Sequence, residues 1–193
     1  MKRKFDGKVI MAVFIGVIMI MSTLGFLVGQ GGTGLEGTAI KVNGYELTPV
    51  QGGYTAEIGD AQIGFTYSPF IANRTKIDSN AINQIKSSKY LVMTSNFTSP
   101  YASDIALMQF QLAEILANEL NIQAQLAFTK NETQLPAITC QNASQFMPVI
   151  EFRDGNTTDA FYQNNCLVLT APSPAGFVEL RDRLVYGLFG ILT

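Results

Sequence analysis

The sequence predicts an α/β domain, of the α+β type with a mixed sheet, held at a membrane by an N-terminal transmembrane helix. Three observations lead to this fold class. Residues 9–28 form an uncharged apolar run, residues 39–70 alternate as strands do, and helical and strand patterns follow each other from residue 78 onward. The 193-residue chain is long enough for one external domain with its own core.

The apolar run VIMAVFIGVIMIMSTLGFLV occupies residues 9–28 and contains no charged side chain. At about 1.5 Å per residue in a helix, it spans roughly 30 Å, the thickness of a bilayer's hydrocarbon core. Residues 1–8 carry four Lys and Arg against one Asp, so the positive-inside rule places this tail in the cytoplasm. We therefore expect an uncleaved, single-pass signal-anchor in the lipid bilayer of the cell membrane, with the C-terminal domain outside.

Two other interpretations of this N-terminal region remain open. A cleaved secretory signal peptide also begins with a basic tail, although its apolar core is usually only about 7–15 residues long. A pilin-type signal would be processed near Gly7, which leaves a chain that starts at Lys8 and packs its apolar helix into a filament.

Residues 29–38 contain five glycines and predict a flexible linker between the membrane and the domain. Residues 39–70 predict a β-hairpin unit. Asn43-Gly44 is a strong two-residue hairpin turn, and residues 54–58 and 62–67 fit further antiparallel strands. One face of this unit is apolar and must pack on something, and the sequence leaves open whether the unit joins the main sheet.

The main sheet and its helices are predicted in residues 78–193. The patterns predict a short helix through residue 87 capped by Asp78 or Ser79, a strand buried on both faces over 90–94, a helix over 100–120 with Ser99 as its cap, and a strand over 122–128. The last three elements have short joins, so we expect a right-handed crossover with two parallel strands.

The C-terminal part predicts further strands and one helix. The strands are expected at residues 137–140, 147–153, 157–162 and 166–170. Asp154-Gly155 predicts a hairpin between the second and third of these strands, and Asn164-Asn165 predicts a second turn before the last strand, whose residues CLVLT predict burial. The final helix is expected over 174–192, with Glu179 and Arg183 paired on its solvent face. The apolar ending YGLFGILT marks a partner surface if it is exposed and core if it is buried.

The chain has two cysteines, Cys140 and Cys166. In an oxidising external compartment an isolated pair is expected to form a disulfide, which the chain-entropy model values at roughly 3.5 kcal/mol for this loop length. The alternatives are a redox pair, which usually has C-x-x-C spacing, and a metal site, which needs further ligands.

Composition argues against several classes of function. The net charge is −2 and no basic cluster follows residue 30, so nucleic acid is not an expected partner. The chain has no His, which removes the commonest general base and metal ligand. We therefore expect no cofactor, no metal site and no enzymatic activity.

Asn-x-Ser/Thr triplets are candidate N-glycosylation sites on an exported chain. Five occur, at Asn73, Asn96, Asn131, Asn142 and Asn156.

The polar loop after residue 94 is the most site-like stretch. It leaves a buried strand and opens a helix, where backbone N–H groups favour anions and ligands often bind. The candidate ligand loop comprises Thr94, Ser95, Asn96, Thr98 and Ser99. The simpler interpretation is that Ser99 only caps the helix.

Carboxylates near the Asp154-Gly155 turn offer a second site hypothesis. Glu151, Asp154 and Asp159 flank that turn and could bind a divalent cation or exchange protons. Solvated turn and strand residues explain the same pattern.

The stretches YLVMTSNFTSP, IALMQFQLAEILANEL, TCQNASQFMPVIEF, NNCLVL and DRLVYGLFGIL lie within residues 90–193. Together they resemble a group of uncharacterised archaeal single-pass envelope proteins. The resemblance implies a membrane anchor, an external α/β domain and a paired cysteine, and it carries over no activity or catalytic residue.

We therefore expect a membrane-anchored, extracytoplasmic, non-catalytic domain that binds or scaffolds another component of the cell envelope, with an envelope protein as its partner. The alternatives are a small-ligand-binding or enzymatic domain that uses the loop of residues 95–99, and a pilin-like filament subunit.

Overall fold

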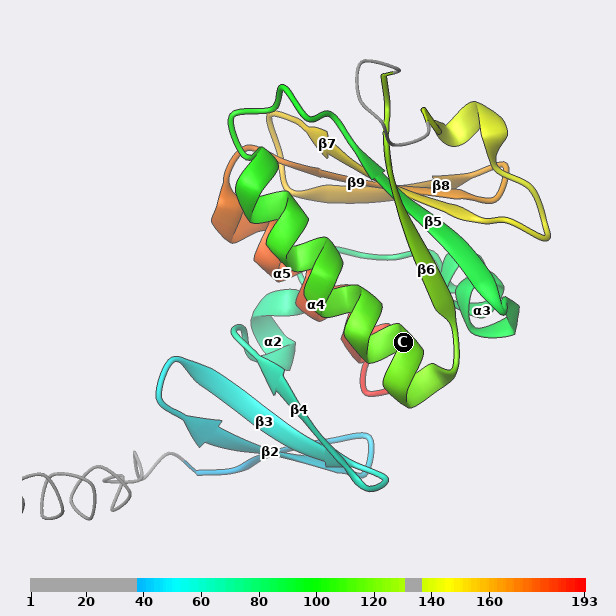
Figure 1. The fold of residues 1–193 in the computed structure, drawn as a ribbon. Coiled ribbons are helices and arrows are strands. Elements are labelled where there is room, and N and C mark those ends of the chain that lie inside the picture. Colours follow the sequence, from blue (N-terminus) through cyan, green and yellow to red (C-terminus); the bar gives the residue numbers. More distant parts are fainter. Residues whose placement is uncertain (1–37, 131–136) are drawn as a thin grey trace, which may run out of the picture. The chain divides into compact units, whose positions relative to one another are not determined.

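The computed structural model describes residues 38–130 and 137–193 (Figure 1). The predicted cytoplasmic tail, the transmembrane helix over residues 9–28 and the linker up to residue 37 lie outside the described residues. Within the two described ranges, no helix has the length and apolar character needed to cross a membrane.

Residues 40–65 form a four-stranded antiparallel sheet in sequence order. Its strands are β1 (Ile40–Val42), β2 (Tyr45–Val50), β3 (Gly53–Ile58) and β4 (Ala61–Phe65). Asn43 and Gly44 both have positive φ, 48° and 86°, as the predicted two-residue turn requires. This meander is a sheet of its own, which answers the question that the sequence left open.

A second, five-stranded mixed sheet has the order β6-β5-β7-β9-β8. Its strands are β5 (Tyr90–Ser95), β6 (Gln123–Phe128), β7 (Val149–Asp154), β8 (Asp159–Gln163) and β9 (Cys166–Ala171). β5 runs parallel to β6 and β7, β7 runs parallel to β9, and β8 is antiparallel to β9. Helix α4 (Ala102–Leu120) joins β5 to β6, so the predicted parallel crossover and the mixed α/β class are confirmed.

The predicted hairpin at Asp154-Gly155 is wrong, because β9 lies between β7 and β8. The hairpin instead joins β8 to β9 through Asn164 and Asn165, which have φ of 51° and 62°. The predicted turn at Asn164-Asn165 and the predicted burial of residues 166–170 are therefore confirmed. The continuous apolar run of β9 suits a central strand buried on both faces, and the alternation of β8 suits an edge.

The helices follow the predicted positions with shifted ends. Helix α3 (Ser79–Ser87) is capped by Asp78, α4 begins at Ala102 rather than at the predicted Pro100, and α5 (Pro174–Leu188) ends four residues before the predicted residue 192. The short helix α2 (Pro69–Ala72) was not predicted. The predicted strand over residues 137–140 is absent from the described structure. That segment makes one isolated bridge, at Ala137, and then the 3₁₀ turn η1 (Cys140–Asn142).

Helix α5 lies at the centre of the core. It contacts α2, α3, α4 and β9, and its apolar side chains join one cluster with those of the meander and of the five-stranded sheet. The apolar ending is part of this core, because Leu188 and Ile191 are buried, so it is not a partner surface. The predicted solvent-side pair is also wrong: Arg183 is buried, and it donates from Nε to Thr75 O (3.1 Å) and from Nη2 to Thr193 O (3.3 Å).

Polar and aromatic contacts join the meander to α5. The ring of Tyr186 stacks on that of Phe65, with centroids 4.1 Å apart, and its hydroxyl donates to Tyr67 O at 2.8 Å. Asp182 Oδ2 accepts the backbone N–H groups of Thr66 and Tyr67, each at 2.8 Å. The chain is thus fixed to the helix directly after β4 ends.

Candidate functional site

The predicted ligand loop is held mainly by its own neighbours. Thr94 and Ser95 are buried in β5 and not in a loop, and Thr94 Oγ1 donates to Ile138 O at 2.7 Å. Asn96 Oδ1 accepts the N–H and the hydroxyl of Thr98, at 3.2 and 2.9 Å. Ser99 Oγ donates to Asp154 Oδ1 at 2.6 Å and accepts the N–H of Tyr101 at 3.0 Å. These bonds shape the turn that leads into α4.

A cavity of about 200 Å³ nevertheless lies at this end of the sheet. After β5 the chain continues to β6 at one edge of the sheet, and after β7 it continues to the strands at the other edge. The carboxyl ends of β5 and β7 therefore form a topological switch point, a position where ligands commonly bind. Of the five predicted loop residues, only Asn96 lines the cavity. The other lining residues are Thr129, Lys130, Glu151, Phe152, Arg153 and Asp154.

Most charges in this cavity are paired within the protein. Glu151 Oε1 accepts two bonds from Arg153, at 2.9 Å from Nε and 2.6 Å from Nη2, and Asp154 accepts the Ser99 hydroxyl. Lys130 is exposed and makes no ion pair in the described part of the chain. The cavity therefore offers one available cation and an amide, which suits weak binding of a small anion better than proton transfer.

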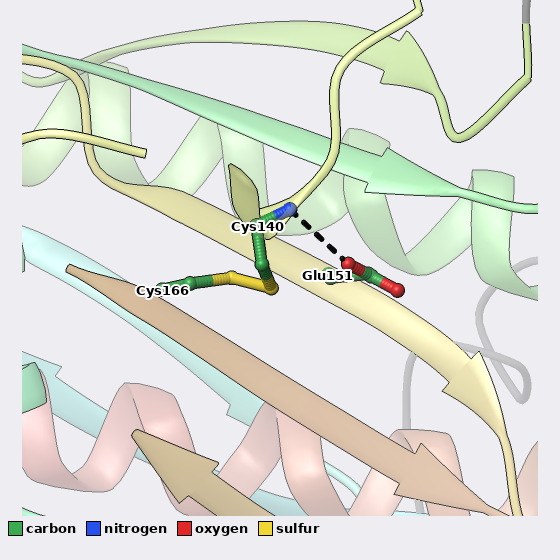
Figure 2. Close-up of side chains that lie close together, drawn as sticks. All are labelled: Cys140, Glu151 and Cys166. Atoms are coloured by element: carbon green, nitrogen blue, oxygen red, sulfur yellow. Dashed lines mark hydrogen bonds between the residues drawn. A yellow bond between two sulfur atoms is a disulfide. The ribbon is translucent and has the colours of Figure 1, made fainter. Parts of the chain in front are cut away.

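The two cysteines form the predicted disulfide. Cys140 Sγ and Cys166 Sγ are 2.07 Å apart, and the bond ties η1 to the start of β9 (Figure 2). The carboxylate of Glu151 lies beside the bridge and accepts the N–H of Cys140 at 3.4 Å. Because the two sulfur atoms are bonded to each other, they cannot ligate a metal in this state. The disulfide therefore has a structural role, and Glu151 lies beside it.

The three carboxylates expected near one turn have different partners. Glu151 pairs with Arg153, Asp154 accepts the Ser99 hydroxyl, and Asp159 Oδ1 accepts the N–H of Ala160. This pattern agrees with the structural interpretation of these residues.

The candidate glycan acceptors differ in accessibility. Asn142 and Asn156 are exposed, Asn73 and Asn96 are half-buried, and Asn131 lies outside the described residues. The Asn142 side chain is engaged, since its Oδ1 accepts the N–H of Thr139 at 2.9 Å. Asn156 makes no side-chain hydrogen bond to the described residues, so it is the most available acceptor.

Helix α4 carries an apolar outer face that the sequence reasoning missed. Its inner face buries Ile105, Met108, Leu112 and Leu116. On the outer face Leu107 and Phe110 are 58% and 56% exposed. The segment IALMQFQLAEILANEL could have indicated this face, because its apolar residues occupy more of the helix circumference than the single stripe that is buried.

Comparison with known protein families, with curated proteins and with solved structures gave no match. The assignment of function therefore depends on the residues and their geometry.

Proposed function

We propose that this protein is a membrane-anchored, extracytoplasmic, non-catalytic domain that binds or scaffolds another protein of the cell envelope, and that the partner contacts the outer face of α4. The observation that carries the proposal is the exposed pair Leu107 and Phe110. They are three residues apart on the helix, so their side chains are neighbours and form one patch.

Exposed neighbours extend this patch along the helix. Ala106 and Ala117 are also exposed, and they add small apolar groups on the same side as Phe110. Burying apolar surface is worth about 25 cal/mol per Å², and apolar patches on a soluble surface often mark a binding site. A helix face of this kind fits a complementary apolar groove or a second helix.

The proposed anchor places the start of the domain close to the bilayer. Residues 29–37 separate the apolar run from the described domain, and even a fully extended chain covers at most about 3.6 Å per residue, or roughly 30 Å in total. The domain would then begin within that distance of the bilayer, so its partner would be a component of the cell envelope.

The test is capture of envelope proteins by the full chain, crosslinked in native membranes and purified in detergent. We expect a defined partner with the native chain and its loss with the double variant Leu107→Asn, Phe110→Ser. Phe161→Ser is the control, since Phe161 is an exposed aromatic residue (46%) on β8, the edge strand of the five-stranded sheet, and not on α4. Equal capture by all three chains, or no partner at all, contradicts the proposal.

A second candidate is a small-ligand site in the 200 Å³ cavity at the ends of β5 and β7. It is supported by the switch-point position and by Lys130, which is available for a small anion. Protection of the Asn96 amide signals on addition of inorganic phosphate would favour this candidate, and a Lys130→Gln variant would abolish that effect.

A further inference from the structure

The outer edge of β4 presents backbone groups that no described residue pairs. The turn Gly59-Asp60 closes the β3–β4 hairpin at the pair Ile58 and Ala61, and in a two-residue hairpin this closing pair is hydrogen-bonded. Bonded and non-bonded pairs then alternate along the strands. The N–H and C=O groups of every second residue after Ala61 therefore point away from β3.

These residues are Gln62 and Gly64, and no backbone or side-chain bond in the described chain uses their N–H or C=O groups on the outer edge. The next residue in the same series, Thr66, donates its N–H to Asp182 Oδ2. Asp182 thus accepts the Thr66 N–H in place of the carbonyl of a neighbouring strand. The outward N–H and C=O groups of Gly64 and Gln62 remain unpaired among the described residues.

This open edge borders a groove of about 330 Å³, which we call the β4–α4 groove. Gln62 and Gly64 line one wall, Glu114, Asn118 and Glu119 of α4 line the other, and Arg181 of α5 also lines it. Nothing lies within 4 Å of the position that a Cβ on Gly64 would take, so the wall of the groove is unobstructed there.

The charges of the groove favour a basic occupant. Glu114 and Glu119 have no cation within 4 Å in the described ranges, whereas Arg181 is already paired with Asp182 at 3.0 Å. The Nε–H of Arg181 has no acceptor among the described residues, so a peptide carbonyl that reached it would satisfy a buried donor.

We propose that the β4–α4 groove binds an extended peptide segment with basic side chains, which adds to β4 as a fifth strand of the meander. Main-chain bonds to Gln62 and Gly64 hold the segment, and its Lys or Arg side chains meet Glu114 and Glu119. The inference deepens the proposed partner-binding role, but it uses residues that the Leu107 and Phe110 patch does not.

The test uses the full chain in zwitterionic detergent micelles. The probe is a fluorescein-labelled peptide of sequence Lys-Val-Lys-Val-Lys, with Glu-Val-Glu-Val-Glu and a fully N-methylated basic peptide as comparators. We expect saturable binding of the basic peptide only, followed by fluorescence anisotropy, and slower hydrogen exchange of the Gln62 and Gly64 amides in its presence.

Variants separate the charge contribution from the backbone contribution. Glu114→Gln with Glu119→Gln should weaken binding roughly three- to tenfold at low ionic strength. The double variant Glu46→Gln, Glu57→Gln is the control. It removes the same number of negative charges from a different cavity of the meander and should leave peptide binding unchanged. Gly64→Pro deletes one outward N–H on an edge strand and should also weaken binding. If that variant does not fold, the charge variants and the exchange data still decide.

The proposal is overturned if the basic peptide does not bind, if the acidic or N-methylated peptide binds equally well, or if the two amides exchange at an unchanged rate. Its failure is distinct from that of the proposed function. If partner capture depends on Leu107 and Phe110 but the basic peptide does not bind, only the groove proposal is contradicted. If the basic peptide binds but partner capture does not depend on those two side chains, only the proposed contact with the α4 patch is contradicted.

Discussion

Asp182 Oδ2 accepts the N–H of Tyr67 at 2.8 Å, so a fully buried carboxylate on α5 holds the chain just after the meander ends. Burial raises the pKa of Asp182 from its ordinary 3.8 to about 6, against the opposing effects of Arg181 and the backbone N–H groups of Thr66 and Tyr67. The folded protein therefore binds this proton more tightly than the unfolded chain does.

Stability should consequently depend on pH through this one group. Its contribution is fully present below about pH 4 and is lost as the pH rises through about 6, and two pKa units correspond to roughly 3 kcal/mol. Asp182→Asn keeps an acceptor oxygen without the charge. We expect the free energy of unfolding of the native chain to fall by roughly that amount relative to the variant between pH 4 and pH 7. Tyrosine fluorescence during chemical unfolding measures this, since the chain has no Trp. Parallel pH profiles for the two chains would show that Asp182 does not titrate in this way.

Tyr186 stabilises the same junction by its ring and by its hydroxyl. Tyr186→Phe keeps the stack on Phe65 and removes the bond to Tyr67 O, which should lower the free energy of unfolding by about 1 kcal/mol. Tyr186→Ala also removes the ring and should lower it by about 3–5 kcal/mol. Unfolding curves at one pH give both values. Equal losses in the two variants would mean that the ring contributes nothing.

The disulfide closes a loop with a sequence separation of 26. The Cys140→Ala, Cys166→Ala variant should be less stable by roughly 3.5 kcal/mol. Adding a dithiol reductant should bring the native chain to about the same stability and should leave the variant unaffected. If the reductant has no effect on the native chain although its thiols become alkylatable, the bridge does not stabilise the fold.

Asn156 should be the principal glycan acceptor of the described residues when the chain is exported in a glycosylating host. It is exposed and its side chain is free of hydrogen bonds to the described residues, whereas the Asn96 side chain is bonded to Thr98 of its own triplet. We expect Asn156→Gln to remove a mass increment that Asn96→Gln retains, as measured by mass spectrometry of the intact protein. The reverse pattern would contradict the ranking by accessibility.

Local patterns predicted the local structure well. Asp78 caps α3, Asn43-Gly44 turns the first hairpin, and the crossover around α4 appears with parallel strands. Each of these features depends on residues close together in the sequence. The disulfide was predictable because only two cysteines exist.

Long-range arrangement was harder to predict. The position of β9 between β7 and β8 depends on which strand is buried on both faces, and turn residues such as Asp154-Gly155 do not report this. The predicted ligand loop was placed at the correct end of the sheet, but the cavity there takes most of its lining from the ends of β6 and β7. The groove beside β4 could not be predicted from the sequence, because its walls belong to β4, α4 and α5, which lie far apart along the chain.

The position of β9 has a consequence for how the polypeptide assembles. Among the strands of the described residues, β9 is the last to leave the ribosome, and it is the one that covers the edge of β7 not paired with β5. Until synthesis has passed Ala171, the nascent sheet has an unpaired hydrophobic border. The nearby hairpin of β8 and β9 can form quickly and close it as a unit, so truncations that stop before Cys166 should aggregate rather than accumulate as smaller folded fragments.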